Sequence, residues 1–358
     1  MFRLACAFAA LVVLIAPSAS DAQGNQSQKP TASELATEQA AEKLGQDWLA
    51  RVAVWSSAQQ TVFVAQERAL VAVSTGSLQA LDFAAKGQAK EGAAWAQDWA
   101  KARRLQMADA QSALAALSPP PPPPVEIANL PGIGALDTAY RSMAAKQSAL
   151  GQTATVLGEE IIGLTERTAG GDAAAASQLK IRRFDVAITM LRGENIVIQA
   201  SLSSSGQNHA QDDIIRSDVA GNLAMIAFLR AQQSYASGDA ASLRAATAEM
   251  RSDAAAAAAA AEQAPLDASS SLGAIRSAPA VAGTPLEKRI EAAFATYADS
   301  AEAEKGLSQI ILAVADRLEK GDAPDSQAIK TALSGLNPLV ERRLELDRRR
   351  KQIIAGEP

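Results

Sequence analysis

The stretch that decides the fold is LDTAYRSMAAKQSALGQTATVLGEEIIGL, residues 136–164. Leucine or methionine recurs in it at every seventh position, and apolar residues fill most of the core positions in between. The first series is Leu136, Met143, Leu150, Leu157 and Leu164, and the second is Tyr140, Ala154 and Ile161. A seven-residue repeat places an apolar stripe along a helix, and such a stripe packs lengthwise against another helix. The stretch therefore predicts a long helix inside a bundle.

Helix signals continue on both sides of this stretch, and strand signals are nearly absent. Alanine, the residue with the highest helix propensity, is by far the commonest, and no Asn-Gly or Asp-Gly hairpin joins β-branched runs. The triplet Gly-Asp-Ala begins at Gly171, Gly238 and Gly321, where Gly suits a helix end and Asp can cap the next helix. We therefore predict an all-α protein, an elongated antiparallel bundle of about eight long helices arranged as coiled-coil-like hairpins.

Prolines and turn residues divide the predicted helices into units. Residues 31–117 are expected to form an N-terminal helical hairpin that turns at residues 74–77, Ser-Thr-Gly-Ser. Residues 118–131 contain six consecutive prolines and predict a stiff polyproline spacer, with a ligand for a proline-binding groove as the alternative. Residues 132–358 are expected to form a C-terminal bundle, with a Ser-, Ala- and Pro-rich loop at 265–283.

The N-terminal segment has the three-part layout of a secretory signal peptide. Arg3 supplies the positive charge, residues 4–16 are an uncharged apolar run, and small side chains lead up to Ala22. The run is shorter than the roughly 20 residues that a membrane-spanning helix needs. We therefore predict a signal peptide at residues 1–22 that is cleaved after Ala22, a disordered lead at 23–30, and a periplasmic or secreted protein without a transmembrane segment after cleavage.

Composition and motifs disfavour several functional classes. Cys6, the only cysteine, precedes most of the apolar run, which argues against a lipoprotein and leaves the mature chain without a thiol. The 34 basic and 39 acidic residues are interspersed, so nucleic acid is not an expected partner. His209, the only histidine, precedes Asp212 and Asp213 at a helix start, where the carboxylates complement the helix dipole. Catalytic triads, phosphate-binding loops and zinc-ligand pairs are absent from the sequence. We expect no enzyme activity, no metal and no cofactor.

One polar residue interrupts an apolar helix pattern. Asn195 falls among Ile188, Leu191, Ile198 and Leu202, and a buried amide without a partner costs about 1–3 kcal/mol. The polar residues expected near it are Arg192, Glu194, Arg216, Asp218 and Asn222. These six residues are the candidate ligand-binding patch. The alternative, which we favour, is a buried asparagine that fixes the register between helices.

All four tryptophans lie in the predicted N-terminal hairpin. Trp48 and Trp55 are seven residues apart, and Trp95 and Trp99 are four apart, so each pair shares a helix face. A turn at 74–77 would place Trp55 level with the second pair. The resulting cluster would either bind an aromatic or cationic ligand or, as we favour, form core packing.

A basic segment, ERRLELDRRRK at residues 341–351, lies near the C-terminus. Its basic residues alternate with acidic ones, which is typical of a solvated helix face with internal ion pairs. Contact with anionic lipid head groups is the alternative.

Together these features predict an exported, non-enzymatic helical protein of the bacterial cell envelope. It would act as an interaction or scaffold protein that binds a protein partner or itself. The alternative is a periplasmic sensor or binding module for a small ligand, which resembles helical-bundle ligand-binding domains of bacterial receptors in architecture alone.

Overall fold

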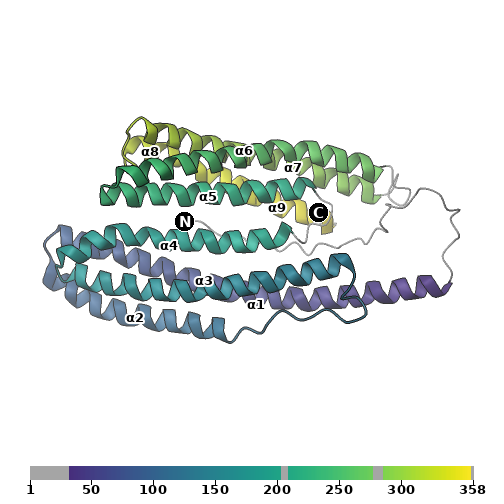
Figure 1. Cartoon of the computed structure of the whole chain (residues 1–358), viewed down its shortest axis with the longest axis horizontal. Coiled ribbons are helices and arrows are strands. Elements are labelled where there is room, and N and C mark those ends of the chain that lie inside the picture. The colour runs from purple at the N-terminus through teal and green to yellow at the C-terminus, as the bar shows by residue number, and fades with distance from the viewer. Residues whose placement is uncertain (1–31, 203–208, 277–284, 356–358) are drawn as a thin grey trace.

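A computed structural model describes residues 32–202, 209–276 and 285–355, and these residues form helices joined by turns and one extended segment (Figure 1). The helices are α1 (Ala32–Ala85), α2 (Ala89–Ala115), α3 (Pro131–Ala169), α4 (Ala173–Leu202), α5 (His209–Ser237), α6 (Ala240–Arg276), α7 (Pro285–Glu319), α8 (Gln327–Leu333) and α9 (Leu336–Ala355). All of them except α8 have 20 or more residues. The predicted all-α antiparallel bundle is confirmed. Within the described ranges, no helix is both long enough and apolar enough to cross a membrane.

The predicted central helix is α3. Of its heptad positions, Leu136, Met143, Leu157 and Leu164 are buried, together with Ile161. The stripe contacts α1, α2 and α4 in two apolar clusters. Pro131 stands at the first helical position, where a missing amide proton leaves no hydrogen bond unmade.

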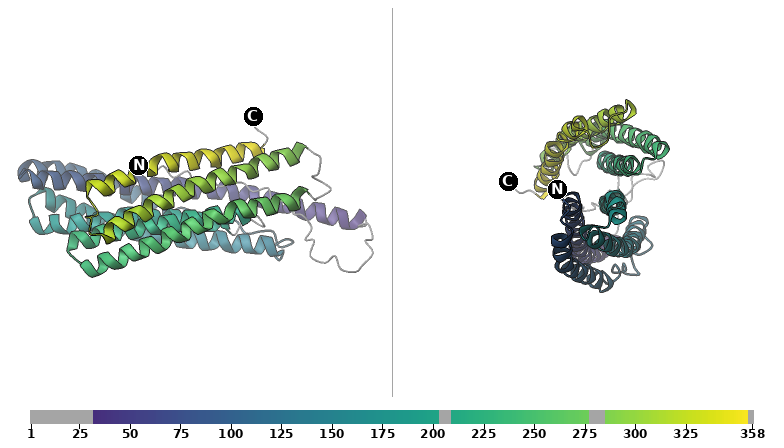
Figure 2. Two further views of the ribbon diagram at one scale, coloured as in Figure 1. Left: turned by 90° about the horizontal axis from the view of Figure 1, so that it is seen from above. Right: turned by 90° about the vertical axis from the view of Figure 1, so that its left-hand side faces the viewer.

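The buried apolar residues form two groups of helices that lie side by side (Figure 2). One group contains α1 to α4 and is centred on side chains such as Val73, Ile161 and Leu179, all fully buried. The other contains α5 to α9 and includes Met250 and Val314. The proline run therefore lies within the first group, and the two cores adjoin where α4 packs against α5.

The predicted turn at residues 74–77 is wrong, because α1 continues without a break to Ala85. Thr75 Oγ1 donates to the Val71 carbonyl at 2.9 Å, so this hydroxyl bonds within the helix rather than forming a turn. Gly76 serves close packing instead, since a Cβ there would lie 2.2 Å from the Trp99 ring. The chain turns at residues 86–88, where Gly87 has a φ of +66° that suits glycine.

The predicted loop at 265–283 is wrong for its first part, because α6 runs through Pro265 to Arg276. Ala264 and Ala268 are buried in a cluster with Tyr297 of α7, and this packing stabilises the helix on both sides of the proline. The remainder of that predicted loop lies outside the described residues, as do the predicted signal peptide (1–22) and the predicted lead (23–30).

The proline run packs along α1 and is not a free spacer. The indole Nε1 of Trp48 donates to the Pro121 carbonyl at 2.9 Å, and that of Trp55 donates to the Ser118 carbonyl at 2.9 Å. An extended proline segment makes no internal hydrogen bonds, so its carbonyls are available to these donors. Pro120 is buried and Ile127 is fully buried at the end of the segment.

Candidate functional site

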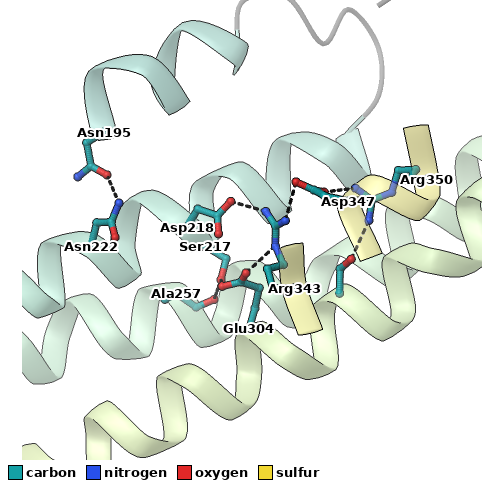
Figure 3. Close-up of polar contacts among 10 residues, drawn as sticks. Asn195, Ser217, Asp218, Asn222, Ala257, Glu304, Arg343, Asp347 and Arg350 are labelled. Carbon is teal, nitrogen blue, oxygen red and sulfur yellow. Dashed lines mark hydrogen bonds and ion pairs between the residues drawn. The ribbon is translucent and has the colours of Figure 1, made fainter. Parts of the chain in front are cut away.

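Four of the six predicted patch residues meet between α4 and α5. Asn222 Nδ2 donates to Asn195 Oδ1 at 2.9 Å, and Asn195 Nδ2 donates to the Val219 carbonyl at 3.4 Å (Figure 3). Glu194 lies beside this pair, and Asp218 lies one turn before Asn222 on α5. Asn195 is 6% exposed, so its amide is buried and satisfied by protein groups.

The carboxyl of Glu194 lies in an unfavourable environment for its charged form. Burial raises the pKa of Glu194 to about 7, and the nearby carboxylates of Asp218 and Glu67 add to the increase. A hydrogen bond with Asn222 acts in the opposite direction. The neutral form of Glu194 is therefore favoured at pH values where a solvent-exposed glutamate is already ionised.

The other two predicted residues lie elsewhere. Arg216 is exposed and pairs with Asp213 on its own helix, with 2.9 Å between Arg216 Nη1 and Asp213 Oδ1. Arg192 is exposed and lines a groove of about 710 Å³ formed by α3, α4 and α5. The six residues therefore do not form a single patch, because Arg216 pairs within α5 and Arg192 lines a groove to which Asn195 does not contribute.

The cation that Asp218 contacts is Arg343 of α9, which the sequence did not reveal. The guanidinium of Arg343 forms an ion pair with Asp218 of α5, and its Nε lies 2.7 Å from Glu304 Oε1 of α7 (Figure 3). Its Nη1 lies 2.8 Å from Asp347 Oδ2 on α9 itself. Because these partners come from three helices, one buried side chain joins α5, α7 and α9.

Three carboxylates contact the guanidinium of Arg343, so ionisation of all three at once is unfavourable. Burial and the neighbouring Asp218 raise the pKa of Glu304 well above its usual range, and burial also raises the pKa of Asp218. Ser217 Oγ donates to the Ala257 carbonyl of α6 at 2.9 Å and lies 3.4 Å from Glu304 Oε2. Asp347 also pairs with a second cation, since Arg350 Nη1 lies 2.9 Å from Asp347 Oδ1, so two guanidiniums face the three carboxylates.

A second arginine of α9 pins the same helix to α7. Arg350 donates to Thr296 Oγ1 at 2.8 Å and to Ser300 Oγ at 2.7 Å, and its guanidinium carbon lies 4.0 Å from the centre of the Tyr297 ring. Arg343 and Arg350 are only 8% and 7% exposed. The predicted solvated face of the basic segment is therefore wrong for these two residues, which form its inner face.

These polar contacts join neighbouring helices and leave few polar groups free to bind a ligand. The polar atoms of the buried Asn195 and Arg343 and of the half-buried Asn222 and Asp218 contact one another or the backbone across helix boundaries. Buried polar groups of this kind are best known for fixing register and orientation between helices. The geometry therefore favours the register interpretation of Asn195 over a ligand pocket.

The four tryptophans form two separate sites. Trp48 and Trp55 both pack edge-on against Tyr140, with ring centres 6.5 Å and 6.0 Å apart. Trp95 and Trp99 stack on each other at 5.4 Å. The predicted alignment of Trp55 with the second pair is wrong because the chain turns at Gly87. The buried positions of Trp48 and Trp55 agree with core packing.

Metal-binding chemistry finds no support in the part of the chain that the structure describes. Within that part, no group of three or more His, Cys, Asp or Glu side chains is placed so that it could hold a metal ion. His209 is exposed at the start of α5. Comparison of the chain with protein families, characterised proteins and solved structures finds no match. Function must therefore be argued from the chemistry of the residues themselves.

Proposed function

We propose that this chain is an exported, non-enzymatic interaction or scaffold protein of the bacterial cell envelope. The proposal rests on where the charged groups inside the bundle lie. Three ionisable groups with perturbed pKa values, Glu304, Asp218 and Arg343, lie between helices and contact one another. Catalytic groups with perturbed pKa values normally face a cleft, so this placement supports a structural role for the network.

The shape of the bundle supports the same proposal. Its long helices expose faces along the whole molecule (Figure 1), and several large apolar side chains remain exposed on α1 and α2. Leu105 of α2 is 65% exposed, and Leu78 and Val71 of α1 are 50% and 44% exposed. The contact between Gly76 and Trp99 fixes an antiparallel register that places Leu105 level with Val71. Val71 and Leu78 are seven residues apart and therefore share a face of α1, and exposed apolar side chains that share a face favour protein contact.

Export is supported by the sequence of residues 1–22, which has the layout of a signal peptide. The mature chain would begin at Gln23 and, without a cysteine, would depend on packing and ionic contacts for stability.

A photo-reactive amino acid at Leu105, introduced into the full chain in its native cell, tests the interaction role. We expect one discrete cross-linked product from Leu105, either with a second copy or with one partner. The matched control is Leu266, an apolar side chain of α6 that is 63% exposed. Equal, diffuse cross-linking from both positions would overturn the proposal, as would cross-linking from neither.

A further inference from the structure

We propose that the groove between α3, α4 and α5 binds a monomeric amphiphilic carboxylate, with the carboxylate at Arg192 and the alkyl chain along α3 and α4. The groove has a volume of about 710 Å³, within the range of roughly 300–1,000 Å³ that is usual for small-molecule sites. Its walls come from three helices of the folded bundle, so it does not require a rearrangement to form. This site is separate from the proposed interaction face on α1 and α2.

The antiparallel register of α3 and α4 gives the groove two different ends. At one end Arg182 of α4 meets Glu160 of α3, with 2.8 Å between Arg182 Nε and Glu160 Oε1. At the other end Gly193 lies against Leu150 of α3, since a Cβ on this glycine would be 3.1 Å from Leu150 Cδ2. Arg192 therefore lies at the end opposite Arg182.

The end that contains Arg182 is already neutralised by protein groups. Arg182 pairs with both Glu160 and Asp185, the only carboxylates among the lining residues. Gln233 of α5 donates to Asp185 Oδ1 at 2.8 Å, and Arg230 donates to Glu249 of α6 at 2.9 Å. An anionic ligand would gain little at this end, because each cation already has a carboxylate partner.

The opposite end carries a cation without such a partner. Arg192 is exposed and, among the residues that the structure describes, makes no hydrogen bond or ion pair. Its neighbours in the groove, Gln152, Thr153 and Thr189, are uncharged hydrogen-bonding residues. One free guanidinium matches a monoanion, and arginine binds carboxylates through two parallel hydrogen bonds. A phosphate monoester carries closer to two charges at neutral pH and would be matched less well.

Between the two ends the groove is mainly apolar, and the charged side chain that lines it there, Arg230, pairs with Glu249. Val156 of α3 is 71% exposed there, although it is an aliphatic side chain, and Leu157 and Ile188 form the buried wall behind it. The lining of α3 runs from Ala149 to Glu160, which is about 16 Å at 1.5 Å per residue. A linear alkyl chain of roughly twelve carbons fits this length. Along its length the groove therefore offers a free cation, an apolar channel and a neutral end, which match the charged head and the alkyl tail of such a ligand.

Calorimetric titration of the full mature chain with sodium dodecanoate, below the concentration at which it forms micelles, tests the proposal. We expect saturable binding of one molecule per chain. Arg192→Ala should weaken binding at least about tenfold, because a charge-assisted hydrogen bond is lost. Shortening the ligand to hexanoate should also weaken binding, by at most about fourfold for each methylene removed.

Three controls decide the outcome. Arg216→Ala removes an exposed arginine outside the groove and should leave the affinity unchanged, and a neutral dodecyl glycoside should bind as weakly as dodecanoate binds to Arg192→Ala. Val156→Asp, which places a negative charge in the channel, should also abolish saturable binding. Absence of binding to the wild type, equal affinities of Arg192→Ala and Arg216→Ala, or binding only to vesicles of anionic phospholipid would overturn the proposal.

Discussion

Replacing Arg343 with methionine should destabilise the bundle more than any other single change on α9. The methionine side chain fills similar volume, but it leaves Asp218 and Glu304 without the cation that they share and leaves Asp347 with Arg350 alone. Removal of one partner from a buried ion pair costs about 3–5 kcal/mol. Since Arg343 is 8% exposed and contacts carboxylates from three helices, we expect a loss in this range at pH 7.

Arg342 is the matched control, because it precedes Arg343 and its side chain is 57% exposed. Its ion pair with Asp299 is a loose contact of 4.0 Å, so Arg342→Met should change the free energy of unfolding by less than about 0.5 kcal/mol. Both variants keep the same helix propensity at adjacent positions, which isolates the effect of burial.

The pH dependence of the Arg343→Met defect has a defined sign. Without the guanidinium, the pKa values of Asp218 and Glu304 in the folded state rise further above those in the unfolded state. The folded state then binds more protons, so the variant loses stability as the pH rises from about 4 towards 7. We expect the difference from the wild type to be small at pH 4 and complete at pH 7.

Urea denaturation followed by circular dichroism at both pH values measures these differences. Glu304→Gln combined with Arg343→Met should recover part of the lost stability, because one unpaired carboxylate is removed. If Arg343→Met lowers the free energy of unfolding by less than about 1 kcal/mol at pH 7, or if the two arginine variants lose equal stability, the ion pairs of Arg343 do not hold the helices together as we infer.

Three further substitutions test separate features, each by urea denaturation. Glu194→Gln should raise the free energy of unfolding by about 2–3 kcal/mol more at pH 8 than at pH 4. The reason is that a carboxyl with a pKa of about 7 in the folded state makes the wild type less stable as the pH rises from 4.5 to 7. The control is Glu126→Gln at an exposed position, which should change the stability little at either pH. Gly76→Ala should cost about 1–3 kcal/mol through its clash with Trp99, whereas Gly45→Ala, with open space around it, should gain up to about 1 kcal/mol. Trp48→Phe should cost about 1 kcal/mol by removing the donor to Pro121, and a neutral result would contradict a docked proline run.

The long helices were predictable because their signal is periodic and local. The heptad that begins at Leu136 identified α3, and its buried positions follow the repeat closely. Ser-Thr-Gly-Ser at 74–77 suits both a turn and a tight helix contact, which is why the turn predicted there is wrong. Only the position of Trp99 in space distinguishes the two, and sequence proximity does not supply it.

The ion pairs of Arg343 were harder to predict because the paired residues are far apart in the chain. Arg343 and Asp218 are separated by 125 residues, and alternating charges around Arg343 are typical of a solvated surface. A signal was nevertheless present, since Leu336, Arg343 and Arg350 fall seven residues apart and all three are buried. Arginines that continue an apolar heptad indicate a buried ionic face.

Native mass spectrometry of the protein, extracted gently from the periplasm of its own cells, tests export and interaction together. We expect a subunit whose mass corresponds to a chain beginning at Gln23, held in a defined complex with a second copy or another protein. A full-length subunit confined to the cytoplasm, or a monomer at every concentration present in the cell, would contradict the proposal of an exported interaction protein.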